Sequence, residues 1–222
     1  MKYYILKELV TYLQQFSNLN HIKRVENTVV KLEFNDRKTV YFDMIKGSSC
    51  IYIKNSKDIN KKLFNAPFDV VLQKKFNNSK IDKVYLRNND KILVIQIKQK
   101  SSYKEQIYKL QFEFTGKNTN LILLDQDDVI LEALRHIDEW TSSRIVKVGQ
   151  KLLELEKPDF EFKCDQIDDM EKYLTNIYDQ KVEKELQNLK KQKSIQINKQ
   201  ITKISKLLGE LKNVEELEQQ SV

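Results

Sequence analysis

The most informative stretch of this sequence is Phe112-Glu113-Phe114-Thr115-Gly116-Lys117-Asn118-Thr119-Asn120-Leu121-Ile122-Leu123-Leu124-Asp125. Aromatic and polar residues alternate before Gly116, four consecutive apolar residues follow Asn120, and the residues between are polar or glycine. The pattern predicts two strands, over residues 108–115 and 120–125, joined by a tight turn in which Gly116 serves the backbone.

Similar alternation of apolar and polar residues continues on both sides of this segment. Residues 129–137 form either another strand or a short helix, since so short an apolar run fits both. Short strands joined by turns pair in antiparallel fashion. The further predicted strands, each bounded by polar residues suited to turns, cover residues 22–34, 39–42, 50–53, 81–85 and 91–98.

Two segments carry the spacing of helices instead. Apolar residues between Tyr4 and Phe16 recur at steps of three and four, which marks one apolar face of a helix. Pro67 opens a second helix that runs through Phe76, because proline suits a first turn. Residues 1–160 are therefore predicted to form an α+β domain built on a mainly antiparallel sheet.

The last part of the chain, residues 161–222, has a different pattern. Apolar residues from Ile167 to Ile177 follow a heptad-like spacing, which continues after phase shifts to Leu211. We expect a long helical segment that starts a coiled coil, and the shifts argue against one uninterrupted coil. Its apolar seam needs a partner: the domain, a second helix of an intramolecular hairpin, or another copy of the chain. We also expect the natural protein to continue beyond Val222.

Composition excludes several classes of protein. Four Gly and two Pro rule out collagen-like and glycine-rich phosphate-loop architectures. The longest uncharged apolar runs, such as residues 121–124, are far shorter than the roughly 18 residues of a membrane span. The start of the chain interrupts its apolar residues with charge and has no secretory cleavage site, so we expect no membrane association and a cytoplasmic location.

Cysteine and histidine usage argues against metal chemistry. Cys50, Cys164, His21 and His136 do not fall at the spacings of a zinc site. The spacing leaves a disulfide between the two cysteines open, but reduced thiols fit a chain without an export signal better. We expect no metal, no cofactor and no catalytic residue.

Positive charge is concentrated in the predicted domain. The whole chain carries +7, from 39 Lys+Arg and 32 Asp+Glu. Residues 161–222 contain 11 Lys and 12 Asp+Glu, which leaves 28 basic and 20 acidic residues, a net of +8, in residues 1–160. Such an excess favours polyanions such as RNA, although a positive surface also serves solubility alone.

Several motifs follow one another in a fixed order. Residues 113–125 precede an apolar segment ending in Arg135-His136, which in turn precedes Arg144-Ile145-Val146-Lys147-Val148-Gly149. Together with the helix after Pro67, these motifs resemble the amino-terminal domain of the NFACT family, ribosome-associated quality-control factors formerly labelled fibronectin-binding proteins. The resemblance covers about residues 1–158.

The resemblance implies a fold similar to the amino-terminal domain of the formamidopyrimidine-DNA glycosylases, followed by a long coiled-coil hairpin. It implies partners: the large ribosomal subunit with its peptidyl-tRNA, and a recruited tRNA, alanyl-tRNA where stalled chains are extended with alanine without a template. The glycosylases attack with an amino-terminal Pro followed by Glu, whereas this chain begins Met1-Lys2-Tyr3. We therefore expect a binding protein and not an enzyme.

In the family, a tRNA-handling Asp-Arg pair opens a central strand, and the matching residues here are Asp90 and Lys91. Lysine keeps a charge for phosphate but lacks the planar fork of arginine, which weakens base readout more than RNA binding. An ordinary hairpin turn also explains the pair. Further candidates for a phosphate-facing patch, which a solvated or salt-bridged face explains equally well, are Lys117, Arg135, His136, Arg144 and Lys147.

The chain departs from the family after Gly149, where a Pro-rich segment and helix-hairpin-helix units are shortened or lost around Pro158. Two alternative functions stand beside the ribosomal one. The first is a fibronectin-binding, adhesin-type interaction module, as the family's older label suggests. The second is a repair enzyme on the glycosylase-like scaffold, which the missing Pro-Glu start disfavours.

Overall fold

The structure is a computed structural model of the chain, and it describes residues 1–55, 62–100, 105–142, 144–155 and 165–219. It divides into two compact units, Met1–Tyr178 and Asp179–Val222, each of which is described by itself. The predicted domain boundary at residue 160, the shortened segment around Pro158 and Cys164 lie outside the described residues.

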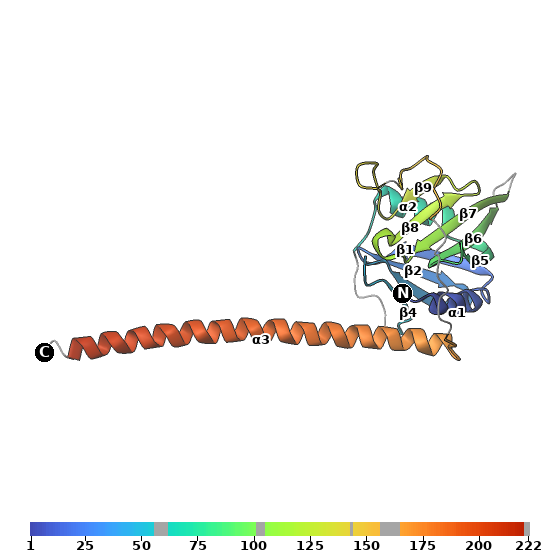
Figure 1. Cartoon of the computed structure of the whole chain (residues 1–222). Coiled ribbons are helices and arrows are strands. Elements are labelled where there is room, and N and C mark those ends of the chain that lie inside the picture. Colours follow the sequence, from blue (N-terminus) through green and yellow to red (C-terminus); the bar gives the residue numbers. More distant parts are fainter. Residues whose placement is uncertain (56–61, 101–104, 143, 156–164, 220–222) are drawn as a thin grey trace. The chain divides into compact units, whose positions relative to one another are not determined.

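The first unit is built on a nine-stranded sheet in which all neighbouring strands are antiparallel (Figure 1), and this confirms the predicted sheet. The strand order is β4-β3-β2-β1-β5-β6-β7-β8-β9. Only the pairing of β1 with β5 joins strands that are not consecutive in sequence. The strands are β1 (Asn18–Arg24), β2 (Val29–Phe34), β3 (Thr39–Asp43), β4 (Cys50–Tyr52), β5 (Ser79–Leu86), β6 (Ile92–Lys100), β7 (Glu105–Glu113), β8 (Asn120–Asp125) and β9 (Ile130–Ala133).

The sheet curls until its two halves face each other. The rings of Phe42 on β3 and Phe112 on β7 stack with their centroids 4.2 Å apart, although five strand-to-strand steps separate β3 from β7 in the sheet order. In a flat sheet those two strands would lie roughly 24 Å apart. The inward-facing side chains of both halves therefore enclose one continuous apolar core.

Helix α1 (Tyr3–Leu13) covers this core with its predicted apolar face, since Leu6, Leu9 and Leu13 are fully buried. The helix ends before Phe16, where the spacing had predicted its end. Phe16 instead stacks on Phe34 of β2 with centroids 4.7 Å apart, so it serves the core from the turn that leads into β1.

Helix α2 (Pro67–Phe76) has the predicted bounds. Pro67 stands in the first turn, where a missing backbone donor costs nothing, and the Asp69 carboxylate accepts a hydrogen bond from the Ala66 amide at 3.0 Å. The same carboxylate forms a bidentate pair with Arg24 of β1, at 2.9 and 2.5 Å. This pair docks the start of α2 onto the sheet.

Short 3-10 turns and a returning segment complete the sheet. The turns are η1 (Asn35–Arg37) and η2 (Gly116–Asn118). Residues 130–133 form a strand, which settles the choice left open for that part of 129–137. Beyond β9, Ile137 and Val146 exchange two backbone hydrogen bonds, of 3.1 and 2.9 Å. The segment thereby builds a second, small apolar cluster with β8 and β9, made of Ile122, Leu124, Ile130, Ala133, Val146 and Leu152.

The long helix predicted at the end of the chain is confirmed as α3 (Met170–Gln219), which spans 50 residues. Its first turns belong to the first unit. Met170 and Leu174 are buried in the main core, and the Tyr178 ring stacks on that of Tyr52, centroid to centroid at 5.3 Å.

The second unit contains the rest of α3. A helix with so much apolar surface in water needs a partner, but the coiled coil itself stays a prediction. Among the described residues, no helix is both long and apolar enough to cross a membrane. The side chains of the predicted seam and its neighbours that are 43–57 % exposed are Val182, Leu186, Leu189, Ile195, Ile197, Ile201, Ile204, Leu207 and Leu208.

Candidate nucleic-acid interface

The turn between β5 and β6 holds the predicted tRNA-binding pair. Asn88 and Asn89 have φ values of 54° and 49°, a left-handed conformation that asparagine tolerates better than most residues. The Asp90 amide donates to the Arg87 carbonyl at 3.0 Å and closes the turn. Two successive residues with positive φ are typical of the tight turns that join antiparallel strands.

Asp90 and Lys91 are held firmly at the end of this turn. The Asp90 side chain is buried, with 9 % of the residue exposed, and its Oδ1 accepts a hydrogen bond from the Lys91 amide at 2.6 Å. The Lys91 carbonyl in turn accepts from the Phe114 amide at 2.8 Å, which ties the pair to the end of β7. The carboxylate therefore fixes the backbone from which the half-buried Lys91 side chain starts.

The amino terminus of the chain lies close to the same turn. Burial lowers the pKa of the Met1 amine, and the positive charge of Lys91 lowers it further. The Met1 amine thus interacts electrostatically with Lys91 and holds its proton less firmly than a free amino terminus does. Sequence reasoning missed Met1, because no local pattern links the first residue of the chain to a turn so far along it.

Arg87, the arginine of this turn, faces another partner. Its Nη2 and the Nζ of Lys109 both donate to Oδ1 of Asp128, each at 2.9 Å. Burial raises the pKa of Asp128, but the hydrogen bonds from these two cations outweigh burial and hold that pKa below its ordinary value. Arg87 is therefore an internal anchor of the turn, and Lys91 is the basic residue that stands next to Asp90.

Arg135 clamps two loops together. Its guanidinium donates to the carbonyl oxygens of Thr119 at 3.0 Å and of Met44 at 2.7 Å. Its backbone amide and carbonyl are both bonded to the Asn120 side chain, at 3.0 and 2.8 Å. Burial lowers the pKa of Arg135, against the opposing effect of Asp43. The residue predicted for a phosphate-facing patch thus holds the ends of the curled sheet together.

Arg144 also points inward. It is 8 % exposed, and its guanidinium forms a bidentate pair with the fully buried carboxylate of Glu113, at 2.8 and 2.6 Å. Its Nε donates to the Leu153 carbonyl at 2.7 Å, and Gln111 donates to Glu113 at 2.7 Å. Arg144 therefore fastens the segment after β9 to β7, and like Arg135 it is not part of an exposed basic patch.

The remaining three candidates are on the surface. Lys117 lies exposed in η2, and Lys147 is exposed beside Val146. His136 Nε2 lies 2.5 Å from Oε1 of Glu132, with half of the histidine side chain exposed. His136 and Lys147 are the sequence neighbours of the isolated Ile137–Val146 bridge. The structure thus leaves Lys117, His136 and Lys147 exposed and sets Arg135 and Arg144 apart as internal residues.

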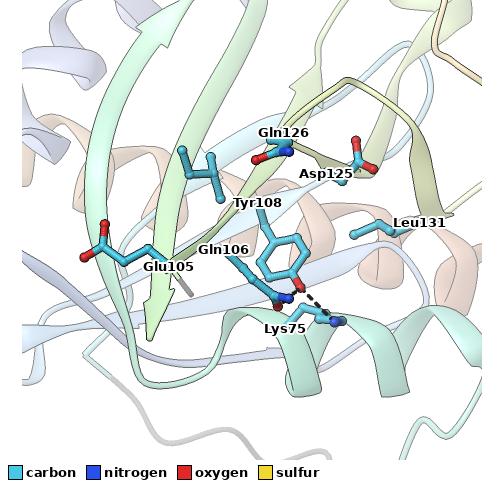
Figure 2. A pocket seen from close by; sticks show the side chains of 8 residues that line it. Lys75, Glu105, Gln106, Tyr108, Asp125, Gln126 and Leu131 are labelled. Atoms are coloured by element: carbon cyan, nitrogen blue, oxygen red, sulfur yellow. Dashed lines mark hydrogen bonds between the residues drawn. The ribbon is translucent and has the colours of Figure 1, made fainter. Parts of the chain in front are cut away.

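A pocket of about 370 Å³ lies elsewhere, beside α2 and the edge of β7 (Figure 2). Lys75 Nζ donates to the Tyr108 hydroxyl at 2.8 Å, and that hydroxyl lies 2.5 Å from Oε1 of Gln106. Glu105 and Asp125 also line the pocket, so its charges are mixed. None of the residues predicted for RNA binding lines it.

The chain matches one family of known proteins over nearly its whole length. A model of the family described as NFACT N-terminal and middle domains matches residues 3–221. The chain belongs to the NFACT family. The family resemblance read from the sequence is thereby confirmed. No curated protein matches this NFACT chain significantly.

Three solved structures share the NFACT fold with this chain at 20 % sequence identity. The N-terminal part of the fibronectin/fibrinogen-binding protein from Streptococcus suis has a TM-score of 0.63, with 71 % of this chain and 62 % of that one covered. The N-terminal domain of fibronectin-binding protein PavA from Streptococcus pneumoniae has a TM-score of 0.61, with 69 % and 61 % covered. The fibrinogen-binding protein from Staphylococcus aureus has a TM-score of 0.55, with 72 % and 58 % covered. This chain therefore spans about three-fifths of each of those structures.

The structure sorts the NFACT motif residues into two groups. Glu113, Asn120, Arg135 and Arg144 bond to one another or to nearby loops and hold the framework. Asp90, with Lys91, instead closes a turn beside the amino terminus. The turn is tied into the framework through backbone hydrogen bonds, while Lys117, His136 and Lys147 are the motif residues that lie exposed on the surface.

Proposed function

We propose that this NFACT domain binds tRNA and the large ribosomal subunit, and that it supports the untemplated addition of alanine to stalled nascent chains. The observation that carries the proposal is the Asp90-Lys91 turn of an NFACT family member, in which the buried Asp90 carboxylate fixes the Lys91 backbone. We propose a binding protein rather than an enzyme.

The charge of the domain supports this proposal. Residues 1–160 carry 28 basic and 20 acidic residues, and a net positive surface raises the association rate with a polyanion. Lys91 supplies a cation in a half-buried setting, where charge interacts more strongly than in bulk water. The Asp90 carboxylate holds the Lys91 backbone amide and so fixes the point from which the Lys91 side chain starts.

Binding of total tRNA over a salt series tests the proposal. Lys91→Ala should weaken binding and lower the slope of log affinity against log salt by about 0.7–0.9, the value of one phosphate contact. Lys7→Ala, which removes an equal charge from an exposed position on α1, is the matched control and should leave the slope nearly unchanged.

Asp90→Ala gives the sharper test. A carboxylate that merely stood near the RNA would repel phosphates, so its removal would tighten binding. A carboxylate that positions Lys91 has the opposite effect, and we expect Asp90→Ala to weaken binding despite the loss of a negative charge. Tighter binding by Asp90→Ala, or a Lys91→Ala slope equal to that of wild type, would remove the turn from the RNA site.

Three finer statements belong to the same proposal. The domain is similar in fold to the amino-terminal domain of the formamidopyrimidine-DNA glycosylases, the apolar face of α3 forms one strand of a coiled coil, and the protein acts in the cytoplasm. The half-exposed apolar residues of α3 support the coiled coil. Co-sedimentation of the natural full-length protein with large ribosomal subunits tests the cellular part, and its failure would count against the ribosomal function.

Fibronectin binding is the second candidate function. It is favoured by the descriptions of the similar structures, which are named as fibronectin- or fibrinogen-binding proteins of streptococci and a staphylococcus. A membrane-impermeant label on intact cells distinguishes the two. Labelling of this protein together with capture by immobilised fibronectin would favour the adhesin function over the cytoplasmic one.

A further inference from the structure

A polar groove of about 660 Å³ lies where β1, β5 and β6 meet the end of α2. It shares no residue with the Asp90-Lys91 turn. Its lining is rich in amides and lysines, and none of the described residues that line it is acidic or aromatic. The residues that line it are Asn18, Asn20, Gln73, Lys74, Asn77, Asn78, Ser79, Lys80, Lys98 and Gln99.

Strand register concentrates positive charge along this groove. Lys80 of β5 pairs directly with Lys98 of β6, and on its other side Lys80 pairs with Asn18 of β1. Like charges in directly facing positions of a sheet are destabilising. Asp82 offsets Lys98, with 2.7 Å between its Oδ1 and the Lys98 Nζ, but Lys80 meets no carboxylate among the described residues.

Lys74 and Asn77 add further donors to the groove, whereas Asn20, Gln99 and Ser79 already donate to carbonyl oxygens through their side chains. Lys74 stands exposed in the last turn of α2, and no carboxylate of the described chain pairs with it. The Asn77 Oδ1 accepts from the Ile22 amide at 2.7 Å, which leaves the Nδ2 of Asn77 as the group able to donate. Lys74 is favourable where it stands, because the carbonyl end of α2 carries partial negative charge. For the direct pairing of Lys80 with Lys98, the described contacts of Lys80 offer no such compensation.

The chemistry of the lining identifies the ligand. Lysine ammonium groups and side-chain amides bind phosphate oxygens, and a lining without aromatic rings offers no platform for stacked bases. We propose that this groove binds the phosphodiester backbone of RNA independently of sequence, as a second contact surface of the domain. The inference rests on the proposed RNA-binding function and adds a site to it.

The groove and the Asp90-Lys91 turn lie at opposite ends of β5. Lys80 is at the start of that strand and Leu86 at its end, so roughly 20 Å of strand separates the two. A folded RNA of the size of tRNA can reach both sites at once. The groove therefore raises affinity and sets orientation, whereas the turn makes its own separate contact.

The test uses the double variant Lys74→Gln/Lys80→Gln and two probes, total tRNA and an oligouridylate of about 12 nucleotides. Two lost phosphate contacts should lower the salt slope by about 1.4–1.8 and weaken binding about 25- to 60-fold at 0.1 M salt. Oligoadenylate should bind as well as oligouridylate. The matched control is Lys7→Gln/Lys172→Gln, which removes the same charge from exposed helical positions outside the groove.

The outcomes separate the two proposals. If the groove variant binds like the control while Lys91→Ala is weakened, the groove inference fails and the proposed function stands. If wild type binds neither probe, the proposed function fails and the groove fails with it. If the groove variant is weakened but Lys91→Ala is not, the groove stands and the turn is not the tRNA site. Thermal unfolding of each variant checks the fold, and removing Lys80 should not lower stability.

Discussion

We predict that Glu113→Ala destabilises the first unit strongly, because it leaves the buried guanidinium of Arg144 without its carboxylate partner. Glu113 is fully buried and the Arg144 side chain is 9 % exposed, so neither charge has water to replace its partner. Removing one partner of a buried ion pair costs about 3–5 kcal/mol. For a unit of this size, that loss corresponds to a decrease in Tm of roughly 6–20 °C.

The assay is urea unfolding, and the m-value should stay unchanged. An unchanged m-value shows that the variant has lost stability and has not changed in compactness. Glu139→Ala is the matched control, because it removes an acidic residue from an exposed site on the same segment. The double variant Glu113→Gln/Arg144→Met leaves no unpaired charge. Its loss in free energy of unfolding should therefore be about 1–3 kcal/mol smaller than the summed losses of Glu113→Gln and Arg144→Met.

Two results would refute this reasoning. A Glu113→Ala protein within about 1 kcal/mol of wild type would mean that the pair is solvated in solution. A fall in the salt slope of tRNA binding for Arg144→Met, measured while the protein is folded, would mean that Arg144 contacts phosphate. We expect that slope to be unchanged, because the guanidinium faces Glu113 and the Leu153 carbonyl.

Two further predictions concern turns. Asp128→Asn should destabilise the fold by about 2–4 kcal/mol because it leaves Arg87 and Lys109 unpaired. Since the pKa of Asp128 is lowered in the folded state, its contribution is present above about pH 4 and is lost as pH falls through the folded pKa. In urea unfolding, the difference in free energy of unfolding between wild type and Asp128→Asn should therefore become smaller only in acid. A difference that does not change with pH would contradict the ion pairing. Gly116→Ala should lower the free energy of unfolding by about 1–2 kcal/mol in the same assay, because the φ of 65° is unfavourable for alanine. The added Cβ meets no neighbour, so the backbone conformation is the whole cause. Equal stability of the two proteins would show that the turn relaxes.

Local spacing in the sequence was enough for the regular elements. Helix α2 and strand β8 have the predicted bounds, since proline at a first turn and an apolar run after polar turn residues are signals carried by neighbouring residues. Strand β7 begins at Glu105, earlier than predicted. Residues 105–107 show no alternation, and they are strand because β6 supplies their backbone partners.

The candidate site was predicted less well, for a different reason. A basic residue in a motif reads the same in sequence whether it faces phosphate or a buried carboxylate. Arg135 meets the Met44 carbonyl because the sheet curls, and Arg144 meets Glu113 because the segment after β9 folds back onto β7. The position of the Met1 amine near Lys91 is likewise invisible until α1 packs on the core.

By itself, the sequence determined the element types except in residues 129–137, the antiparallel pairing, the long final helix and the family, because periodicity and ordered motifs are properties of residues close along the chain. The tertiary structure alone decided which cations are internal and which are available. It made Arg87, Arg135 and Arg144 parts of the framework, and it lined a groove with Lys80 and Lys98. The physical reason is that charge pairing depends on distance in space and on burial, and the strand order and curvature of the sheet set both.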